Sequence, residues 1–342
     1  MAAGQPRLAA VLIAGDIGGT KTRLAIVSAE RGPRAPLAEK TFRSADYQRL
    51  EDLLEEFFAG SGLHAERACL GVAGPVLDGK ARVTNLPWAI SANNLQDKLG
   101  IERVELINDL VATAYAVPRL EVSDLETLNQ GCADISGAIA VLAPGTGLGE
   151  AYITRDGKRY LAHASEGGHA DFAPTSELQI DLLHYLQSRI EHVSYEWICS
   201  GMGLPNIYAF LKDSGRHTEP GWLAKELAAA DDKTPLIITA AIDEKRPCEL
   251  CATALDLFCA VLGAEAGNLA LKMLATGGVY LGGGIPPHIL SRLKGGGFME
   301  AFRRKGRFKG LLAGIPVQVI LNPKAALLGA AWFGLDGAQS SD

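Results

Sequence analysis

Residues 8–28 read LAAVLIAGDIGGTKTRLAIVS, and this stretch decides the class of fold. Its two outer parts, Leu8–Gly15 and Thr22–Ser28, are apolar and rich in branched side chains, which is typical of buried strands. The part between them, residues 16–21, is polar and rich in glycine. We therefore predict a hairpin that opens a β-sheet. The apolar run ends at Asp16, too early for a signal peptide or a membrane span.

A second strand–turn–strand pattern of the same kind occurs in the middle of the chain. Ile139–Leu142 and Glu150–Thr154 are apolar strands that flank the glycine turn PGTGLG at residues 144–149. A chain of 342 residues is long enough for two domains, so we expect two related lobes with a cleft between them. Strands alternate with helices in the rest of the chain, which predicts an α/β fold. Further strands are expected at Ala68–Val72, Val104–Ile107 and Val279–Leu281, and helices at Leu50–Phe58, Asn94–Leu99, Leu110–Ala116, Glu177–Ile190, Tyr195–Leu211, Glu249–Leu274 and Pro323–Phe333.

The composition and charge of the chain favour small molecules as its binding partners. The net charge of −6 gives no basic field for nucleic acid or for a membrane surface. The six cysteines have irregular spacing, so we interpret all of them as free packing thiols in a reducing compartment, which predicts a cytoplasmic protein. Cys248 and Cys251 have the spacing of metal ligands, but no second pair or nearby histidine completes a zinc site.

Both glycine turns suit phosphate groups. Glycine lets backbone N–H groups approach phosphate oxygens, and each turn carries a threonine, Thr20 or Thr146. Ordinary hairpin turns are the alternative, but the pair of turns together with the glycines at 282–284 favours nucleotide binding. Neither turn has the Walker A pattern. Asp16 lies beside the first turn, where its carboxylate is placed either to hold Mg²⁺, directly or through water, or to cap the amides of the turn.

Asn108 and Asp109 follow a predicted buried strand and precede a helix. That position puts them at the carboxyl edge of the sheet, where α/β proteins bind ligands. An aspartate at this edge is suited to accept a hydroxyl proton during phosphoryl transfer, and an asparagine to hold a neighbouring hydroxyl. Capping of the helix by Asp109 is the alternative.

Glu166-Gly167-Gly168-His169 places a carboxylate and an imidazole around two glycines. This set is able to grip adjacent hydroxyl groups while the glycines allow a ligand to come close. Metal binding by His169 is the alternative. Glu196 joins this group as a ligand candidate, or is a first-turn carboxylate favoured by a helix dipole.

The order and spacing of seven motifs resemble the bacterial glucokinase family, the hexokinase branch of the actin-like ATPase superfamily. The motifs are DIGGT at 16–20, GVAGP at 71–75, TNLPW at 84–88, IND at 107–109, GTGLG at 145–149, EGGHADFAP at 166–174 and SGMGLPNIY at 200–208. The resemblance implies a two-domain, ribonuclease H-like α/β fold with an inter-domain cleft. It implies a small domain of residues 1–119 with 322–342 and a large domain of residues 120–321.

The resemblance also implies an activity: ATP-dependent phosphorylation of glucose at its 6-hydroxyl, at the entry to glycolysis, by a homodimer that uses Mg²⁺. Asp109 matches the catalytic base. The sugar ligands would be Asn108, Asp109, Glu166, His169 and Glu196, and the ATP ligands Gly15, Asp16, Ile17, Gly18, Gly19, Thr20, Gly145, Thr146, Gly147, Gly282, Gly283 and Gly284.

Three positions depart from the glucokinase pattern. Lys21 and Thr22 resemble the opening of the sister group of repressors and kinases, but residues 170–176 lack the cysteines of that group's zinc loop. Glu150 stands where an apolar residue is usual, and the sequence offers no account of it. A kinase for another hexose and a non-kinase actin-like ATPase remain alternatives. A sugar-responsive repressor is disfavoured because too few residues precede Leu8 to form a DNA-binding module.

Overall fold

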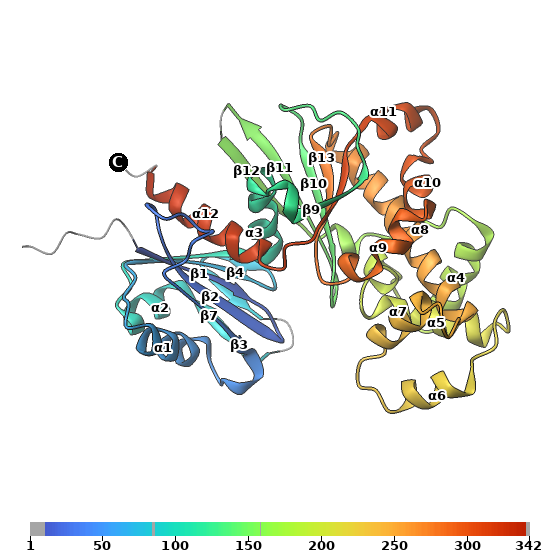
Figure 1. The fold of residues 1–342 in the computed structure, drawn as a ribbon, viewed down its shortest axis with the longest axis horizontal. Helices are drawn as coiled ribbons and strands as arrows, with labels where there is room; N and C mark the ends of the chain where they lie inside the picture. Colours follow the sequence, from blue (N-terminus) through green and yellow to red (C-terminus); the bar gives the residue numbers. More distant parts are fainter. Residues whose placement is uncertain (1–10, 84–85, 158, 340–342) are drawn as a thin grey trace, which may run out of the picture. The chain divides into compact units, whose positions relative to one another are not determined.

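The computed structural model describes residues 11–83, 86–157 and 159–339. The chain divides into two compact units (Figure 1). The first unit holds Met1–Leu120, Tyr160–Ala164 and Asn322–Asp342, and the second holds Glu121–Arg159 and Ser165–Leu321. Residues 160–164 are thus grouped with the first unit and not with the larger domain expected from the sequence. Residues 8–10 of the first predicted strand and residues 84–85 of the TNLPW motif lie outside the described residues.

The first unit is built on a mixed sheet with the strand order β3-β2-β1-β4-β8. The predicted hairpin is confirmed, since β1 and β2 pair antiparallel and place Asp16 opposite Arg23. Strands β1, β4 and β8 run parallel, so their carboxyl ends meet at one edge. The strands are β1 Val11–Ile17, β2 Lys21–Ser28, β3 Ala38–Arg43, β4 Arg67–Val72 and β8 Arg103–Asn108, with a small separate sheet of β5 Val76–Leu77, β6 Lys80–Arg82 and β7 Ala89–Ser91.

Helices cover both faces of this sheet. Side chains alternate along β1, so Ile13 joins a core with Leu53 of one helix while Leu12 packs with Leu327 of another. The helices are α1 Leu50–Ser61, α2 Ala92–Leu99, α3 Asp109–Ala116 and α12 Ala325–Gln339. Helices α1 and α2 share one core, and α3 and α12 share the other (Figure 1). Helix α12, near the C-terminus, therefore packs against a sheet whose first strand lies near the N-terminus.

The second unit repeats the arrangement on a larger scale. The six-stranded sheet has the order β12-β11-β10-β13-β14-β9, and its edge strand β12 contains the residues 160–164 that are grouped with the first unit. Strand β10 pairs antiparallel with β11 and parallel with β13, as β1 pairs with β2 and β4. The prediction of a second hairpin of the same kind is confirmed. The strands are β9 Leu125–Asn129, β10 Ile139–Pro144, β11 Leu148–Asp156, β12 Arg159–Ser165, β13 Gly278–Leu281 and β14 Val317–Ile320.

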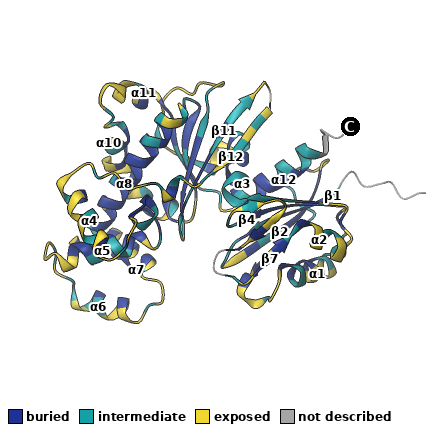
Figure 2. Cartoon of the chain, turned by 180° about the vertical axis from the view of Figure 1, so that it is seen from behind, coloured by how far each residue is buried: buried dark blue, intermediate teal, exposed yellow. Residues whose placement is uncertain are grey.

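Helix α8 is the centre of the second unit (Figure 2). Among the described residues, α8 is the one helix that is long and apolar enough to cross a bilayer. However, 78% of its most apolar stretch is buried inside the protein, as in the core helix of a globular protein. It packs against α5, α7 and α10. The helices of this unit are α4 Glu177–Gln187, α5 Gly203–Asp213, α6 Gly221–Ala228, α7 Thr234–Ile242, α8 Glu249–Met273, α9 Leu290–Lys294, α10 Gly297–Arg303 and α11 Lys309–Gly314.

The predicted continuous helix over Tyr195–Leu211 is wrong. A short 3-10 helix, η5, covers Tyr195–Trp197, and α5 begins only at Gly203. Two hydrogen bonds account for the break: the Gly201 N–H donates to the Gly145 carbonyl at 2.7 Å, and the Gly203 N–H donates to Ser200 Oγ at 3.1 Å. The chain leaves the helical path here because it is tied to the second glycine turn.

The cysteines pack largely as expected. Cys69, Cys199, Cys248, Cys251 and Cys259 are buried free thiols, but Cys132 is exposed, so the interpretation of all six as packing residues is wrong at that position.

Candidate active site

The first unit gathers its predicted site residues at one edge of its sheet. Ile17 of β1 is level with Val72 of β4, and Val72 is level with Asn108 of β8. These strands are parallel, so the first glycine turn, residues 18–20, and the Asn108-Asp109 pair leave the sheet at the same edge.

Hydroxyl groups hold the first glycine turn. The turn closes through a hydrogen bond from the Gly18 N–H to the Lys21 carbonyl at 3.1 Å. Ser44 Oγ donates to the Gly18 carbonyl at 2.7 Å, and the Ser44 N–H donates to the Thr20 carbonyl at 3.1 Å. Because the Ser44 hydroxyl proton is used in this way, Thr22 Oγ1 is the donor across the 3.0 Å contact with Ser44 Oγ. Ser44 is fully buried, and nothing in the local sequence indicated this role.

Asp16 lies beside this turn and is paired with a cation. Its Oδ2 atom accepts a hydrogen bond from Arg23 Nη1 at 3.1 Å. Burial raises the pKa of the Asp16 carboxyl, and the guanidinium of Arg23 opposes that rise. The described residues contain no group of three or more His, Cys, Asp and Glu side chains able to hold a metal ion. One carboxylate fits Mg²⁺ only in the manner usual for nucleotide enzymes, where phosphates and water supply the remaining ligands.

Asn108, and not Asp109, caps helix α3. Asn108 Oδ1 accepts hydrogen bonds from the N–H groups of Leu110 and Val111 at 2.9 and 3.2 Å, and Asn108 Nδ2 donates to the Gly74 carbonyl at 3.1 Å. Asp109 is the first residue of the helix, where Leu110 N–H also donates to its Oδ1 at 3.0 Å. The alternative reading of Asp109 as the N-cap is therefore wrong, and its half-buried carboxylate stands beside a cap that a neighbour already provides.

The second unit brings together both of its predicted glycine segments. The Gly145 N–H donates to the Gly147 carbonyl at 2.8 Å, which closes the second turn. The Gly282 N–H donates to the Leu142 carbonyl at 2.8 Å, so the glycines at 282–284 follow β13 beside this turn. The second turn and the glycines at 282–284 are thus neighbouring backbone segments, an arrangement suited to binding one phosphate-bearing ligand.

Three side chains of the second unit form an acid–imidazole cluster: Glu166, His169 and Glu196. His169 Nε2 lies 4.0 Å from Glu166 Oε2, and His169 Nδ1 lies 3.9 Å from Glu196 Oε1. Glu166 and His169 are open to solvent, with 71% and 59% of their side chains exposed, whereas Glu196 is 20% exposed. A group of acceptors around one imidazole is suited to several adjacent hydroxyls.

Glu196 links this cluster to the second glycine turn. Its Oε2 atom accepts a hydrogen bond from the Leu148 N–H at 2.8 Å. The carboxylate also fills the space that a side chain on Gly147 would take, so a larger residue there would displace Glu196. The sequence placed Glu196 in the cluster but gave no sign of this link.

A buried carboxylate, Glu150, lies beneath the cluster. It is 2% exposed, and its Oε2 atom occupies the position of a side chain on Gly167. Burial is the main cause that raises the pKa of Glu150 to about 8, and the neighbouring Glu265 carboxylate adds to the rise. The signal for this residue was present in the sequence, as one acidic residue within an apolar strand.

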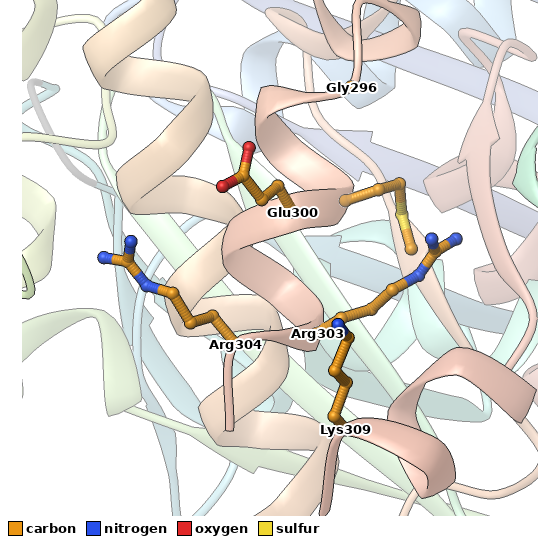
Figure 3. Close-up of a pocket in the computed structure, with 6 residues that line it drawn as sticks. Gly296, Glu300, Arg303, Arg304 and Lys309 are labelled. Atoms are coloured by element: carbon orange, nitrogen blue, oxygen red, sulfur yellow. The ribbon is translucent and has the colours of Figure 1, made fainter. Parts of the chain in front are cut away.

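A pocket of about 380 Å³ lies elsewhere in the second unit (Figure 3). None of its lining residues belongs to the predicted site. Two of its arginines have structural partners: Arg303 Nη2 donates to Asn129 Oδ1 at 2.7 Å, and Arg304 Nη2 donates to the Thr175 carbonyl at 2.8 Å. The lining residues are Gly296, Met299, Glu300, Arg303, Arg304 and Lys309.

Solved structures with a similar fold define the class as sugar kinases with the actin-like ATPase fold. The glucokinase of an Antarctic psychrotroph has a TM-score of 0.80 and 33% identity, covering 95% of this chain and 99% of that one. A Balamuthia mandrillaris glucokinase in complex with glucose has a TM-score of 0.79 at 23% identity, covering 95% and 94%. A glucokinase of the ROK family from Streptomyces griseus, in complex with glucose and AMPPNP, has a TM-score of 0.65 at 22% identity, covering 96% and 100%. The last two show the fold alone.

Sequence comparison gives the family. A profile described as glucokinase matches residues 13–336. The glucokinase of Synechocystis sp. is 41% identical over 341 residues, covering 93% of this chain and 96% of that protein. The glucokinase of Yersinia pestis is 37% identical over 321 residues, covering 94% and 95%. The chain belongs to the glucokinase family, and the family resemblance predicted from the motifs is confirmed.

Proposed function

We propose that this protein transfers the γ-phosphoryl group of ATP to the 6-hydroxyl of glucose. The observation that carries the proposal is the position of Glu196, whose carboxylate contacts the second glycine turn through Leu148 and the imidazole of His169. One side chain is thus shared by a predicted phosphate-binding segment and a predicted sugar-binding cluster. A hydroxyl-binding cluster has no purpose in an actin-like ATPase that does not act on sugars.

In the proposed reaction, Glu166, His169, Glu196 and Asn108 hold the sugar hydroxyls. Asp109 accepts the proton of the 6-hydroxyl as the oxygen of that hydroxyl attacks the γ-phosphorus of ATP, and the bond from that phosphorus to the β,γ-bridging oxygen breaks, so that ADP leaves. The protein contributes mainly by aligning the reactants, because phosphoryl transfer requires little covalent chemistry from side chains.

The nucleotide would be held by backbone groups. Supporting this, the two turns present glycines, Gly18-Gly19 and Gly145 with Gly147, in segments fixed by their own hydrogen bonds. Gly282–Gly284 would lie by the adenosine. Asp16 would hold Mg²⁺ through water, and that ion would neutralise charge on the transferring phosphates.

The domain division, the cellular location and the oligomeric state are also part of the proposal. The division into a small domain, 1–119 with 322–342, and a large domain, 120–321, is supported by the two compact units. Buried free thiols favour the reducing cytoplasm, where the reaction would supply glycolysis. We infer a homodimer from the family resemblance, and sedimentation equilibrium tests it.

An assay of ADP release with MgATP tests the activity. Each hexose of a panel is compared with a reaction that contains no sugar. We expect ADP release that depends on glucose and yields glucose 6-phosphate. Release that is equal without sugar would reject the proposal in favour of a non-kinase ATPase, and a higher kcat/KM for another hexose would assign that sugar instead.

A further inference from the structure

The second unit buries two carboxylates close to the acid–imidazole cluster. Glu150 on β11 is 2% exposed and Glu265 on α8 is 0% exposed. One oxygen of each, Oε1, is buried and accepts no hydrogen bond from the described residues. A buried ionised carboxylate normally has several donors, so this pair departs from the usual pattern.

Glu265 has polar partners that fix it in place. Its Oε2 atom accepts a hydrogen bond from Asn268 Nδ2 at 2.8 Å, and its Oε1 atom lies 3.9 Å from Lys272 Nζ. Lys305 Nζ donates to Asn268 Oδ1 at 2.5 Å and to the Ala264 carbonyl at 2.9 Å. The two lysines of this region therefore lie beside Glu265 or its neighbours on α8.

Glu150 has a contact of a different kind. Its Oε2 atom lies against Gly167, in the space where any other residue would carry Cβ. The next glycine, Gly168, lies in the same way against the Leu148 carbonyl. Two consecutive glycines of the short helix η4, Gly167–His169, thus rest directly on β11, and Glu150 is the side chain beneath the turn that presents Glu166 and His169.

The surroundings favour the uncharged form of Glu150. Burial raises its pKa to about 8, Glu265 adds to the rise, and Lys272 opposes it. Burial also raises the pKa of Glu265 and lowers that of Lys305. Two further groups face the pair: Tyr195 of η5, whose pKa is raised by burial and by Glu265, and the Cys199 thiol, whose pKa is raised by burial and by both carboxylates. Among the described residues, no cation forms a salt bridge with Glu150.

We propose that Glu150 is a positioning residue for sugar binding: its protonated carboxyl supports the turn 166–169, and loss of that proton weakens glucose binding while leaving kcat nearly unchanged. An ionised Glu150 would be repelled by Glu265 and drawn toward water, and the turn that rests on it would move as well. This inference rests on the proposed function, because it concerns the affinity for glucose.

The test is the pH dependence of the glucose KM, measured at saturating MgATP between pH 6.5 and about 9.5. If binding needs the protonated acid, the wild-type KM rises about tenfold from pH 7 to pH 9, as the carboxyl titrates near pH 8. Glu150→Gln keeps the shape and lacks the charge, so its KM at pH 7 stays near the wild-type value and does not rise. Glu150→Ala removes the support and raises KM at every pH.

Glu300→Gln is the matched control. It is an exposed glutamate of the same unit, outside the proposed machinery, and it should keep the wild-type profile. A wild-type KM that is constant from pH 7 to pH 9 would overturn the inference. A Glu150→Gln variant whose KM matches that of Glu150→Ala would overturn it as well.

Thermal unfolding separates this inference from the proposed function. A carboxyl whose pKa is higher in the folded state contributes stability that is complete below its unfolded value of 4.5 and is lost as the pH rises through about 8. The melting temperature of the wild type should therefore fall relative to Glu150→Gln between pH 6 and pH 9, whether or not glucose is phosphorylated. Parallel curves would reject a protonated Glu150. Absence of turnover with glucose at pH 7 would reject the proposed function instead.

Discussion

The two glycine turns belong to equivalent hairpins but carry their carboxylates differently. In the first hairpin, Asp16 precedes the turn and faces Arg23 on the opposite strand, 3.1 Å away. In the second, Glu150 follows the turn, and the residue opposite it is Leu142. The first carboxylate is therefore part of an ion pair, and the second is a buried acid without a cation across the strand pair.

This difference indicates how the two units divide the work. The first turn is held by the hydroxyl groups of Ser44 and Thr22, and its carboxylate, Asp16, is paired with Arg23. The second turn is joined to the acid–imidazole cluster, through Glu196 above Gly147 and through Glu150 beneath Gly167. Changes at the first turn and at Asp109 should mainly affect ATP binding and chemistry, and changes at Glu196 and Glu150 should mainly affect sugar binding.

The largest effect is expected for Asp109→Asn in the first unit. Loss of the base should lower kcat by about 10²- to 10⁴-fold, the usual contribution of general base catalysis, with little change in the glucose KM. The coupled ADP assay measures both constants, and an unchanged melting temperature shows that the fold is intact. Turnover near the wild-type level would remove Asp109 from the mechanism.

Glu196→Gln tests the link in the second unit. The Leu148 N–H would lose an ionised acceptor, and His169 would lose a neighbouring charge. Hydrogen bonds to charged groups contribute about 1.5–3 kcal/mol, so the glucose KM should rise by about 10- to 150-fold. Glu226→Gln is the control, since that exposed glutamate pairs with Arg246 away from the cluster. An equal change in the control would show that the effect is not local.

Gly167→Ala tests the close contact beneath the cluster. The added methyl group would overlap the carboxyl of Glu150, so the variant should lose about 1–3 kcal/mol of stability and bind glucose more weakly. Gly310→Ala is the matched change, because a methyl group there meets no atom within 4 Å. Denaturant unfolding compares the two variants. Equal stabilities would mean that η4 does not rest on Glu150.

The smallest effect is expected for Ser44→Ala. The Gly18 carbonyl and the Thr22 hydroxyl would both lose a partner, at a cost of about 1–2 kcal/mol. If the turn binds ATP, the KM for ATP should rise by a few fold while the glucose KM stays constant. A rise confined to the glucose KM would contradict the division of work between the two turns.

The sequence was sufficient for the hairpins and for the long helix α8, because their apolar patterns are local and strong. It did not reveal β9 and β14, which are short strands that pair across a large separation in the sequence. The same limit applies to the site. The predicted cluster lies within one unit, but the support of Gly167 by Glu150 and the break at 198–202 depend on contacts between distant segments, which periodicity does not report.

The position of helix α12 has a consequence for the order in which the protein folds during synthesis. Its residues Leu327, Ala330 and Ala331 complete the core that covers Leu12 and Cys69. The ribosome makes α12 only after the whole of the second unit, residues 121–159 and 165–321, has been made. N-terminal domains usually fold first, but the core of this first unit cannot be completed before the last helix is made. Helix α3 is made early and contributes Ala112 to this core, but Leu12 and Cys69 lack the side chains of α12 until the final helix is made.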